Sequence, residues 1–195
     1  MGLSIWTLPS SLKVGGGNYA IRTDFRVVLG IFKYLNDSSY DDVSKMIIVL
    51  KSLYIDEIPH ELYEEAYRKA LDFFALGNAS QSVTERHRKP DIMDWEQDGP
   101  LIISAINAVA GTDIRLMPTC HWWTFLGYYQ EIGECTFSTI LSIRDKRIRG
   151  KKLHDWEQQY MREHSDIVIL NKQTEEEKAK AEADRKAIEA MLKGE

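Results

Sequence analysis

The chain lacks the residues and runs that mark several protein classes. It has only two cysteines in 195 residues, Cys120 and Cys135, and they do not form a CxxC pair. No apolar run approaches the roughly 20 residues that are needed to cross a bilayer. The opening MGLSIWTLPSS has neither a basic start nor a long apolar stretch, so it does not look like a secretory signal. The simplest interpretation is a reduced, cytosolic protein without a membrane span.

An excess of positive charge is also missing. The formal net charge is −5 at pH 7, whereas nucleic-acid-binding proteins gain much of their affinity by neutralising phosphates. Two short segments depart from this balance, residues 86–89 and the basic run 144–152, in which six cations are opposed only by Asp145. The run is either a solvated helix end, which the helix macrodipole favours, or a patch for an acidic partner or a nucleic acid. We favour the solvated helix end, because charged runs usually face water.

Motifs of catalysis and metal binding are absent as well. The glycine run 15–17 is not followed by the Lys-Ser or Lys-Thr of a phosphate-binding loop, and no serine lies in a GxSxG elbow. Cys120, His121 and Cys135 could in principle hold a metal, but they lack the spacing of known zinc sites. We therefore expect no enzyme activity, no cofactor and no metal.

The apolar pattern predicts a mainly α-helical fold. Short β-prone segments on either side of Gly15-Gly16-Gly17-Asn18 predict a β-hairpin within residues 1–22. From Thr23 or Asp24, either of which can cap a helix, the apolar period becomes helical. The helical period continues to about residue 171, and we interpret residues 23–171 as a single helical body.

Caps and helix breakers divide this body into successive helices. A polar, basic surface loop is predicted at residues 77–94. The predicted helices begin at Thr23 or Asp24 (apolar face Phe25, Val28, Leu29, Phe32, Leu35), after Asn36–Ser39 (Val43, Met46, Ile47, Leu50, Leu53), at Pro59 (Leu62 to Leu76, ended by Gly77), at Pro100 (ended by Gly111), at Pro118 or Thr119 (ended by Gly133), at Thr136 or Ser138, and at Leu153.

The most aromatic stretch is CHWWTFLGYY, residues 120–129. On a helix, Trp122 and Phe125 share one face, and the neighbouring rings widen it, which is typical of a central helix packed by several others. Aromatic platforms that stack bases usually have basic neighbours, and none flanks this stretch. We interpret it as core, with one surplus ring, Trp123 or Tyr128, lining a partner surface.

The last segment, residues 172–195, consists mainly of alanine and charged residues. A capping box at Thr174 and i,i+4 ion pairs predict a protruding, largely solvated C-terminal helix. Its few apolar side chains cluster near the end of the chain. We expect this cluster, Ile188, Met191 and Leu192, to contact a partner protein.

Several blocks of sequence, taken in order, resemble the gene-product-fifteen family of bacteriophage tail proteins. The most distinctive pieces are TDFR, ahead of a helix, and HWW. The resemblance covers about residues 19–165 and leaves the tail after Asn171 outside. The blocks are YAIRTDFRVVL, IDEIPHELYEEAYRKALDFF, DWEQDGPLIISAINAVAGTDIRL, and HWWTFLGYYQEI with FSTILSIRDKRI.

The resemblance implies a role in assembly, without chemistry. Genes of this family usually lie beside the tape-measure gene of long-tailed phages, which implies a tail assembly chaperone that binds the tape-measure protein during tail morphogenesis. Such a protein is expected in the host cytoplasm and not in the mature virion. Tail tube subunits and further copies of the chain are secondary candidate partners, and a membrane is not expected. The alternative is a small phage-encoded nucleic-acid-binding protein that uses residues 144–152.

Overall fold

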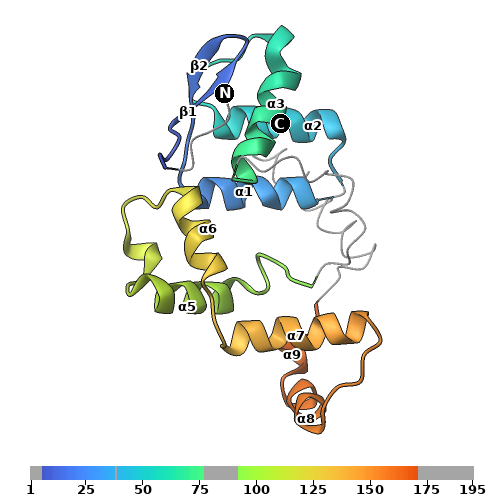
Figure 1. The fold of residues 1–195 in the computed structure, drawn as a ribbon. Helices are drawn as coiled ribbons and strands as arrows, with labels where there is room; N and C mark the ends of the chain where they lie inside the picture. Colours follow the sequence, from blue (N-terminus) through green and yellow to red (C-terminus); the bar gives the residue numbers. More distant parts are fainter. Residues whose placement is uncertain (1–5, 38, 77–91, 171–195) are drawn as a thin grey trace, which may run out of the picture.

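The structure is a computed structural model, and it describes residues 6–37, 39–76 and 92–170 (Figure 1). Within these ranges the fold is mainly α-helical with an N-terminal antiparallel hairpin, as the sequence predicted. The predicted C-terminal helix, residues 172–195, lies outside the described residues. The elements are β1 (Ser11–Val14), β2 (Gly17–Ala20), α1 (Phe25–Asn36), α2 (Asp42–Leu53), η1 (His60–Leu62), α3 (Tyr63–Phe74), α5 (Gly99–Ala110), η2 (Ile114–Leu116), α6 (Trp122–Gln130), α7 (Thr136–Ile148), α8 (Asp155–Glu163) and α9 (Ser165–Val168).

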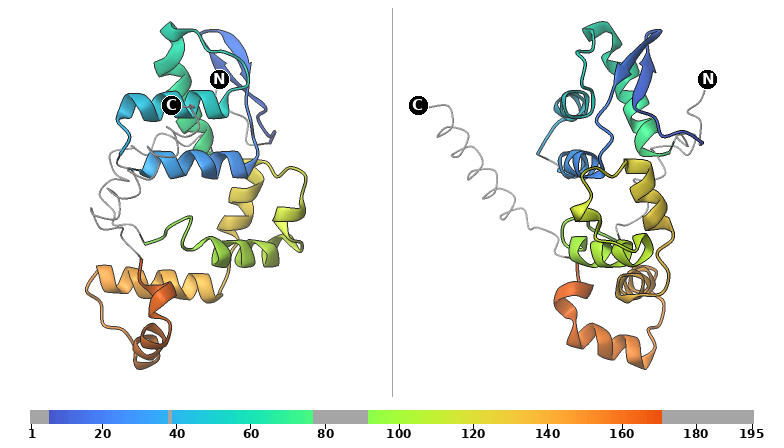
Figure 2. Two further views of the ribbon diagram at one scale, coloured as in Figure 1. Left: turned by 180° about the vertical axis from the view of Figure 1, so that it is seen from behind. Right: turned by 90° about the vertical axis from the view of Figure 1, so that its left-hand side faces the viewer.

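The elements are stacked along one long direction. Figure 1 and Figure 2 show the hairpin, α2 and α3 at one end, with α1 crossing below them. Helices α5 and α6 form the middle, and α7, α8 and α9 form the opposite end. The start of α3 and helix α8 therefore lie far apart, at the two ends of the molecule.

The hairpin turn is tighter than the sequence predicted. Val14 pairs with Gly17, so only two residues form the turn and Gly17 belongs to the strand. Gly15 and Gly16 have φ values of 55° and 86°, which glycine adopts without a steric penalty. A Cβ on Gly15 would lie 2.6 Å from a methyl carbon of Leu62. Position 15 thus requires glycine for two reasons, its positive φ and its close packing on η1.

Helix α1 begins as predicted, and α2 begins later than predicted. Asp24 caps α1 by accepting a 2.9 Å hydrogen bond from the Arg26 N–H. The cap of α2 is Asp41 rather than residues 36–39, and it accepts from the Ser44 N–H at 2.6 Å. This hydrogen bond lowers the pKa of Asp41.

The apolar face predicted for α2 is only half buried. Leu50 and Leu53 are in the core as expected, together with Val49. Val43 and Ile47 are 60% and 37% exposed, so the prediction that they are buried is wrong. The buried residues of α2 all lie in its last turns, and its first turns extend beyond the core.

Helices α3 and α5 end in different ways. Helix α3 ends at Phe74, and Leu76 adopts a left-handed φ of 57° beyond it. Gly77, the predicted stop, lies outside the described residues. Helix α5 has Pro100 in its first turn and Gly111 at φ 68° after its last, both as predicted.

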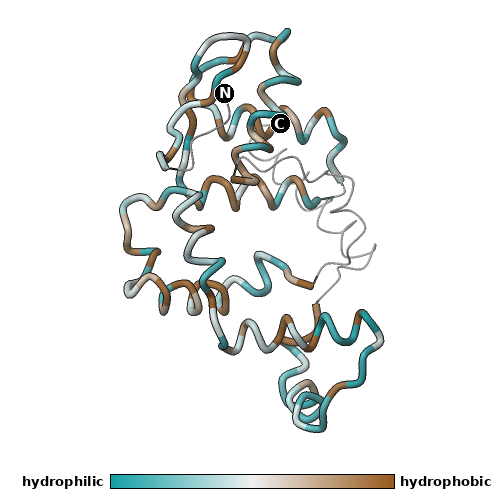
Figure 3. The backbone as a smooth tube through the Cα atoms, viewed as in Figure 1, coloured by the Kyte–Doolittle hydropathy of each residue, from teal (hydrophilic) through white to brown (hydrophobic). Residues whose placement is uncertain are grey.

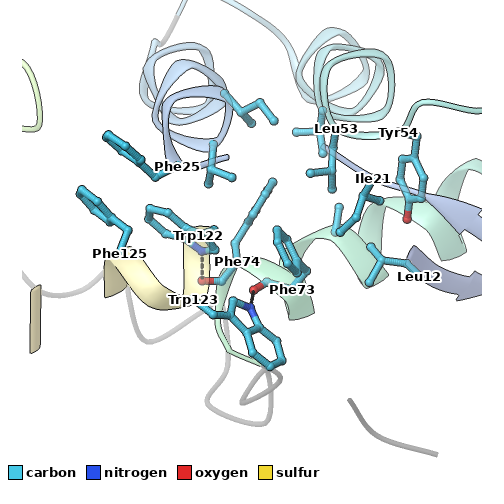
Figure 4. Close-up of a cluster of buried hydrophobic side chains, with 14 of the residues drawn as sticks. Leu12, Ile21, Phe25, Leu53, Tyr54, Phe73, Phe74, Trp122, Trp123 and Phe125 are labelled. Carbon is cyan, nitrogen blue, oxygen red and sulfur yellow. Dashed lines mark hydrogen bonds between the residues drawn. The ribbon is translucent and has the colours of Figure 1, made fainter. Parts of the chain in front are cut away.

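The buried apolar residues form two clusters of unequal size. The larger cluster draws on the hairpin, α1, α2, α3, α5, α6 and Phe137 at the start of α7. Figure 3 shows the apolar stretches of α1 and α5, and Figure 4 shows the aromatic centre of this core. The smaller cluster consists of Ile140, Ile143 and Val168, with partly buried residues of α8 around it.

Candidate functional site

The HWW motif caps helix α6 and supplies its first buried side chains. The helix begins at Trp122, so the predicted start at Pro118 or Thr119 is too early. His121 is the N-cap, and its Nδ1 accepts a 3.0 Å hydrogen bond from the Trp123 N–H. Because Nδ1 accepts, Nε2 carries the proton and donates to the Pro9 carbonyl at 3.1 Å.

Both tryptophans bind the end of helix α3 (Figure 4). The last carbonyls of a helix have no partner within it. The Trp122 Nε1–H donates to the Phe74 carbonyl at 3.1 Å, and the Trp123 Nε1–H donates to the Phe73 carbonyl at 2.9 Å. The two indoles therefore cap α3 while their rings fill the core.

The core interpretation of this stretch is confirmed for Trp122, which is 1% exposed. Trp123 is 8% exposed and hydrogen-bonded inside, so it does not line a partner surface, and that prediction is wrong. Its neighbour Tyr128 is partly buried against the same core. A contact between Tyr128 and a partner stays a prediction.

The TDFR motif binds the HWW motif directly. The Trp122 N–H donates to the Thr23 carbonyl at 2.7 Å, and the Phe25 N–H donates to the Cys120 carbonyl at 2.9 Å. The Cys120 N–H donates to Asp24 Oδ2 at 3.0 Å. The starts of α1 and α6 thus satisfy each other's backbone groups, which explains why two segments far apart in the sequence are both distinctive.

Arg26 extends this junction to η2. Its Nη1 donates to Asp24 Oδ2 at 2.9 Å. Its Nη2 contacts the carbonyls of Ile114, Arg115 and Met117 at 3.0–3.2 Å. All four residues of TDFR therefore take part in holding the fold.

A second junction is a buried ion pair between α5 and α7. Asp98 and Arg144 have side chains 1% and 4% exposed, and they form a two-pronged contact of 2.7 and 2.9 Å. The Arg144 guanidinium also donates to the carbonyls of Ile92, Ile167 and Val168 at 2.7–3.0 Å. These five contacts use all five guanidinium N–H groups.

The expectation that the basic run 144–152 is solvated is therefore wrong in part. Arg144 is a core residue and Lys146 donates to the buried Glu157 at 2.6 Å, whereas Arg149 stays 62% exposed and pairs with Asp145 on the surface at 2.7 Å. Three of its six cations thus have an acidic partner within the fold. This gives less support to the nucleic-acid alternative, because such binding needs cations that can reach phosphates.

Glu157 is held in its ionised form by the same contacts. Burial alone would raise the pKa of this carboxyl, which is 1% exposed. Hydrogen bonds from Lys146 and the His154 N–H outweigh burial and lower the pKa of Glu157 below its ordinary value.

The sequence offers Cys120, His121 and Cys135 as possible metal ligands. Within residues 6–37, 39–76 and 92–170, no group of three or more His, Cys, Asp or Glu is arranged to hold an ion. Cys120 is buried, and burial raises the pKa of its thiol. His121 caps α6, and Cys135 stands at the N-cap of α7.

Residues 6–170 match the family model described as bacteriophage Gp15 protein. The chain belongs to the bacteriophage Gp15 family. No curated protein and no solved structure gives a significant match to it. The Gp15 match includes both the TDFR–HWW junction and the Asp98–Arg144 pair. It ends before Ile188, Met191 and Leu192, which also lie outside the described residues, so their role as partner contacts stays a prediction.

Among the exposed apolar side chains in the described part of this Gp15-family protein, two groups form candidate binding surfaces. The first, here the helix-pair surface, consists of Tyr34, Tyr40, Val43 and Ile47 on α1, α2 and their connection. Tyr34 is 41% exposed, and its ring meets that of Tyr40 edge-on at 5.7 Å.

Among the described helices of this family member, none combines the length and apolar character that a membrane span requires.

The second surface, here the basic tip, lies at the turn from α7 to α8. It consists of Arg147, Ile148, Lys151, Lys152 and Trp156. Trp156 is 56% and Ile148 is 44% exposed. The three cations are exposed and have no ion pair with any residue that the structure describes.

Proposed function

We propose that this protein is a tail assembly chaperone that binds the tape-measure protein during phage tail morphogenesis. Membership of the bacteriophage Gp15 family supports a role in building the phage particle. The observation that carries the proposal is the helix-pair surface, where α1 and α2 leave apolar side chains exposed at the end of a packed helix pair.

The geometry of this surface suits a helical partner. Val43 and Ile47 are one turn apart on α2, and the Tyr34 and Tyr40 rings pair edge-on on α1 and the connection that leads to α2. An amphipathic helix binds such a surface through apolar residues spaced three and four apart. A long helical tape-measure protein offers this pattern repeatedly, so several chaperone copies could bind along it.

The distinctive motif residues support an activity based on contacts. TDFR, HWW, Asp98 and Arg144 are all engaged in hydrogen bonds that join helices. We propose that the protein acts without catalytic residues, metal or cofactor. We further propose that it works in the host cytoplasm during assembly and is absent from the finished virion.

Co-expression with the tape-measure protein of the same phage tests this function. A tagged wild-type chain should retain the tape-measure protein in a pull-down. The double variant Val43→Ser/Ile47→Ser should retain at least tenfold less, because it removes the exposed apolar side chains of α2. Its circular dichroism and melting temperature should match those of the wild type, since both positions are exposed.

The matched control is Leu116→Ser, which removes an 81% exposed side chain on η2. This variant should capture the tape-measure protein as the wild type does. Failure of the wild type to capture it would overturn the proposed function. Equal capture by the wild type and the double variant would show that the helix-pair surface is not the binding site.

A further inference from the structure

The basic tip is held in shape by two specific contacts. Gly150 has a φ of 63°, and the Lys151 N–H donates to the Lys146 carbonyl at 2.8 Å, which ends α7 in a tight reversal. The Lys146–Glu157 ion pair then fixes α8 against α7. Glu157 is buried, whereas Trp156, about 100° away round the helix, is 56% exposed. The exposed indole and cations are therefore presented on a turn that these contacts hold in place.

The opposite end of the molecule carries the complementary charge. Residues 55–65 contain five carboxylates and no lysine or arginine. Asp56 and Glu65 are occupied by the Ala20 and Gly15 N–H groups. The other three, Glu57, Glu61 and Glu64, are exposed and have no hydrogen bond or ion pair with the described part of the chain. We call these three carboxylates the acidic end.

The basic tip thus carries three unpaired cations and exposed apolar side chains, and the acidic end carries three unpaired carboxylates. Figure 1 and Figure 2 place α8 and the α7–α8 turn at one extreme of the molecule, and η1 with the start of α3 at the other. A single copy cannot bring them together, because the body of the molecule separates them. Two copies can do so without any change of fold.

We infer that this protein self-associates head to tail, with the basic tip of one copy docked on the acidic end of the next. The contact joins two different surfaces, so each copy keeps one free end, and association continues into a linear series. Charge complementarity orients the copies, and Trp156 and Ile148 add apolar surface on the tip side of the contact. This inference does not depend on the tape-measure protein.

A second copy suits the tip better than a nucleic acid does. The chain carries a net charge of −5, which repels a phosphate backbone as a whole. Only three cations of the basic run are unpaired, and Asp155 stands beside them. The acidic end matches this number of charges with three carboxylates.

Sedimentation velocity of three proteins tests the arrangement. The tip variant carries Lys151→Ser, Lys152→Ser and Trp156→Ser, and the end variant carries Glu57→Gln, Glu61→Gln and Glu64→Gln. At low salt the wild type should form dimers and larger species that grow with concentration, and high salt should shrink them. Each variant alone should stay monomeric. An equimolar mixture of the two variants should form dimers and nothing larger, because only one intact tip and one intact end meet.

The control Leu116→Ser removes an 81% exposed apolar residue on η2, away from both ends, and it should associate like the wild type. Circular dichroism and melting temperature should show that all variants keep the fold. A wild type that stays monomeric at low salt overturns the inference, as do variants that dimerise alone or fail to dimerise when mixed. Salt-dependent binding of duplex DNA by a monomeric wild type, lost in the tip variant, would assign the tip to nucleic acid instead.

Discussion

The two buried clusters of this protein are built in different ways. The larger one is aromatic: Phe25 stacks on Phe125 at 4.6 Å, and Phe32 meets Trp122 edge-on at 5.4 Å. The smaller one has only three fully buried apolar side chains, and its helices are joined through Arg144. Where apolar area is plentiful, packing joins the helices. Where it is scarce, charged groups with every hydrogen bond satisfied do so.

The difference follows from the lengths of the elements. Helix α9 has four residues and α8 has nine, too few for either to be stable alone. Arg144 binds the carbonyls of Ile167 and Val168 and so holds the α9 backbone directly. We therefore expect the α7–α9 region to open at a lower free energy than the aromatic core.

The largest effect is expected at the centre of the aromatic core. Trp122→Ala should lower the free energy of unfolding by about 3–5 kcal/mol, the usual result of emptying a large buried site. Thermal and urea unfolding measure this loss. Trp122→Phe keeps most of the volume but leaves the Phe74 carbonyl without its donor, so it should lose less. An unchanged melting temperature for Trp122→Ala would mean that the ring is not part of the core.

A smaller and more local effect is expected at the ion pair. Arg144→Lys keeps the charge but loses the planar fork, so it should cost about 1.5–3 kcal/mol. Hydrogen exchange should speed up in α7 and α9 and stay unchanged in α1 and α3. Equal acceleration in all four helices would show that the two regions open together and would remove the distinction between them.

Acid should loosen the smaller region through Glu157. Because its pKa is lowered in the folded protein, the ionised carboxylate stabilises the fold fully above the ordinary value of 4.5. This stabilisation is lost as the pH falls through the lowered pKa. Hydrogen exchange of α8, compared between neutral and acidic pH, should show this change. Glu157→Gln should remove the pH dependence of α8, and persistence of that dependence would point to another group.

The smallest effect is expected at the exposed tryptophan. Trp156→Ser should change the free energy of unfolding by less than about 0.5 kcal/mol, because the side chain is 56% exposed. Chemical unfolding of this variant beside Trp122→Ala compares the same residue type in two surroundings. A loss as large as that of Trp122→Ala would show that Trp156 packs against the body.

Local signals in the sequence were sufficient for much of the fold. The hairpin, the Asp24 cap and the α5 boundaries depend on neighbouring residues, and the structure confirms them. The prediction that the whole apolar face of α2 is buried was wrong, because periodicity shows which residues share a face. It does not show how far the neighbouring elements extend along the helix. Val43 and Ile47 satisfy the period but lie beyond the core.

The roles of the residues in the candidate sites could not be predicted from local patterns, because these roles depend on contacts between distant segments. Arg144 belongs to a basic run, and its partner Asp98 is 46 residues away. Trp123 adjoins Trp122 on one helix, and it is buried because the end of α3 offers carbonyls to both indoles. The sequence suggested Trp123 or Tyr128 as an outward ring, and the burial of Trp123 could be recognised only after α3 was placed.

The junction of TDFR with HWW also sets an order of events during synthesis. The Phe25 N–H finds its acceptor in Cys120, and Asp24 binds an amide 96 residues further along the chain. A ribosome that has made only α1, α2 and α3 therefore holds a half-finished core. Its Phe32 ring lacks the contact with Trp122, and the Phe73 and Phe74 carbonyls lack the hydrogen bonds from the two indoles. The nascent chain can therefore complete its core only after α6 has emerged.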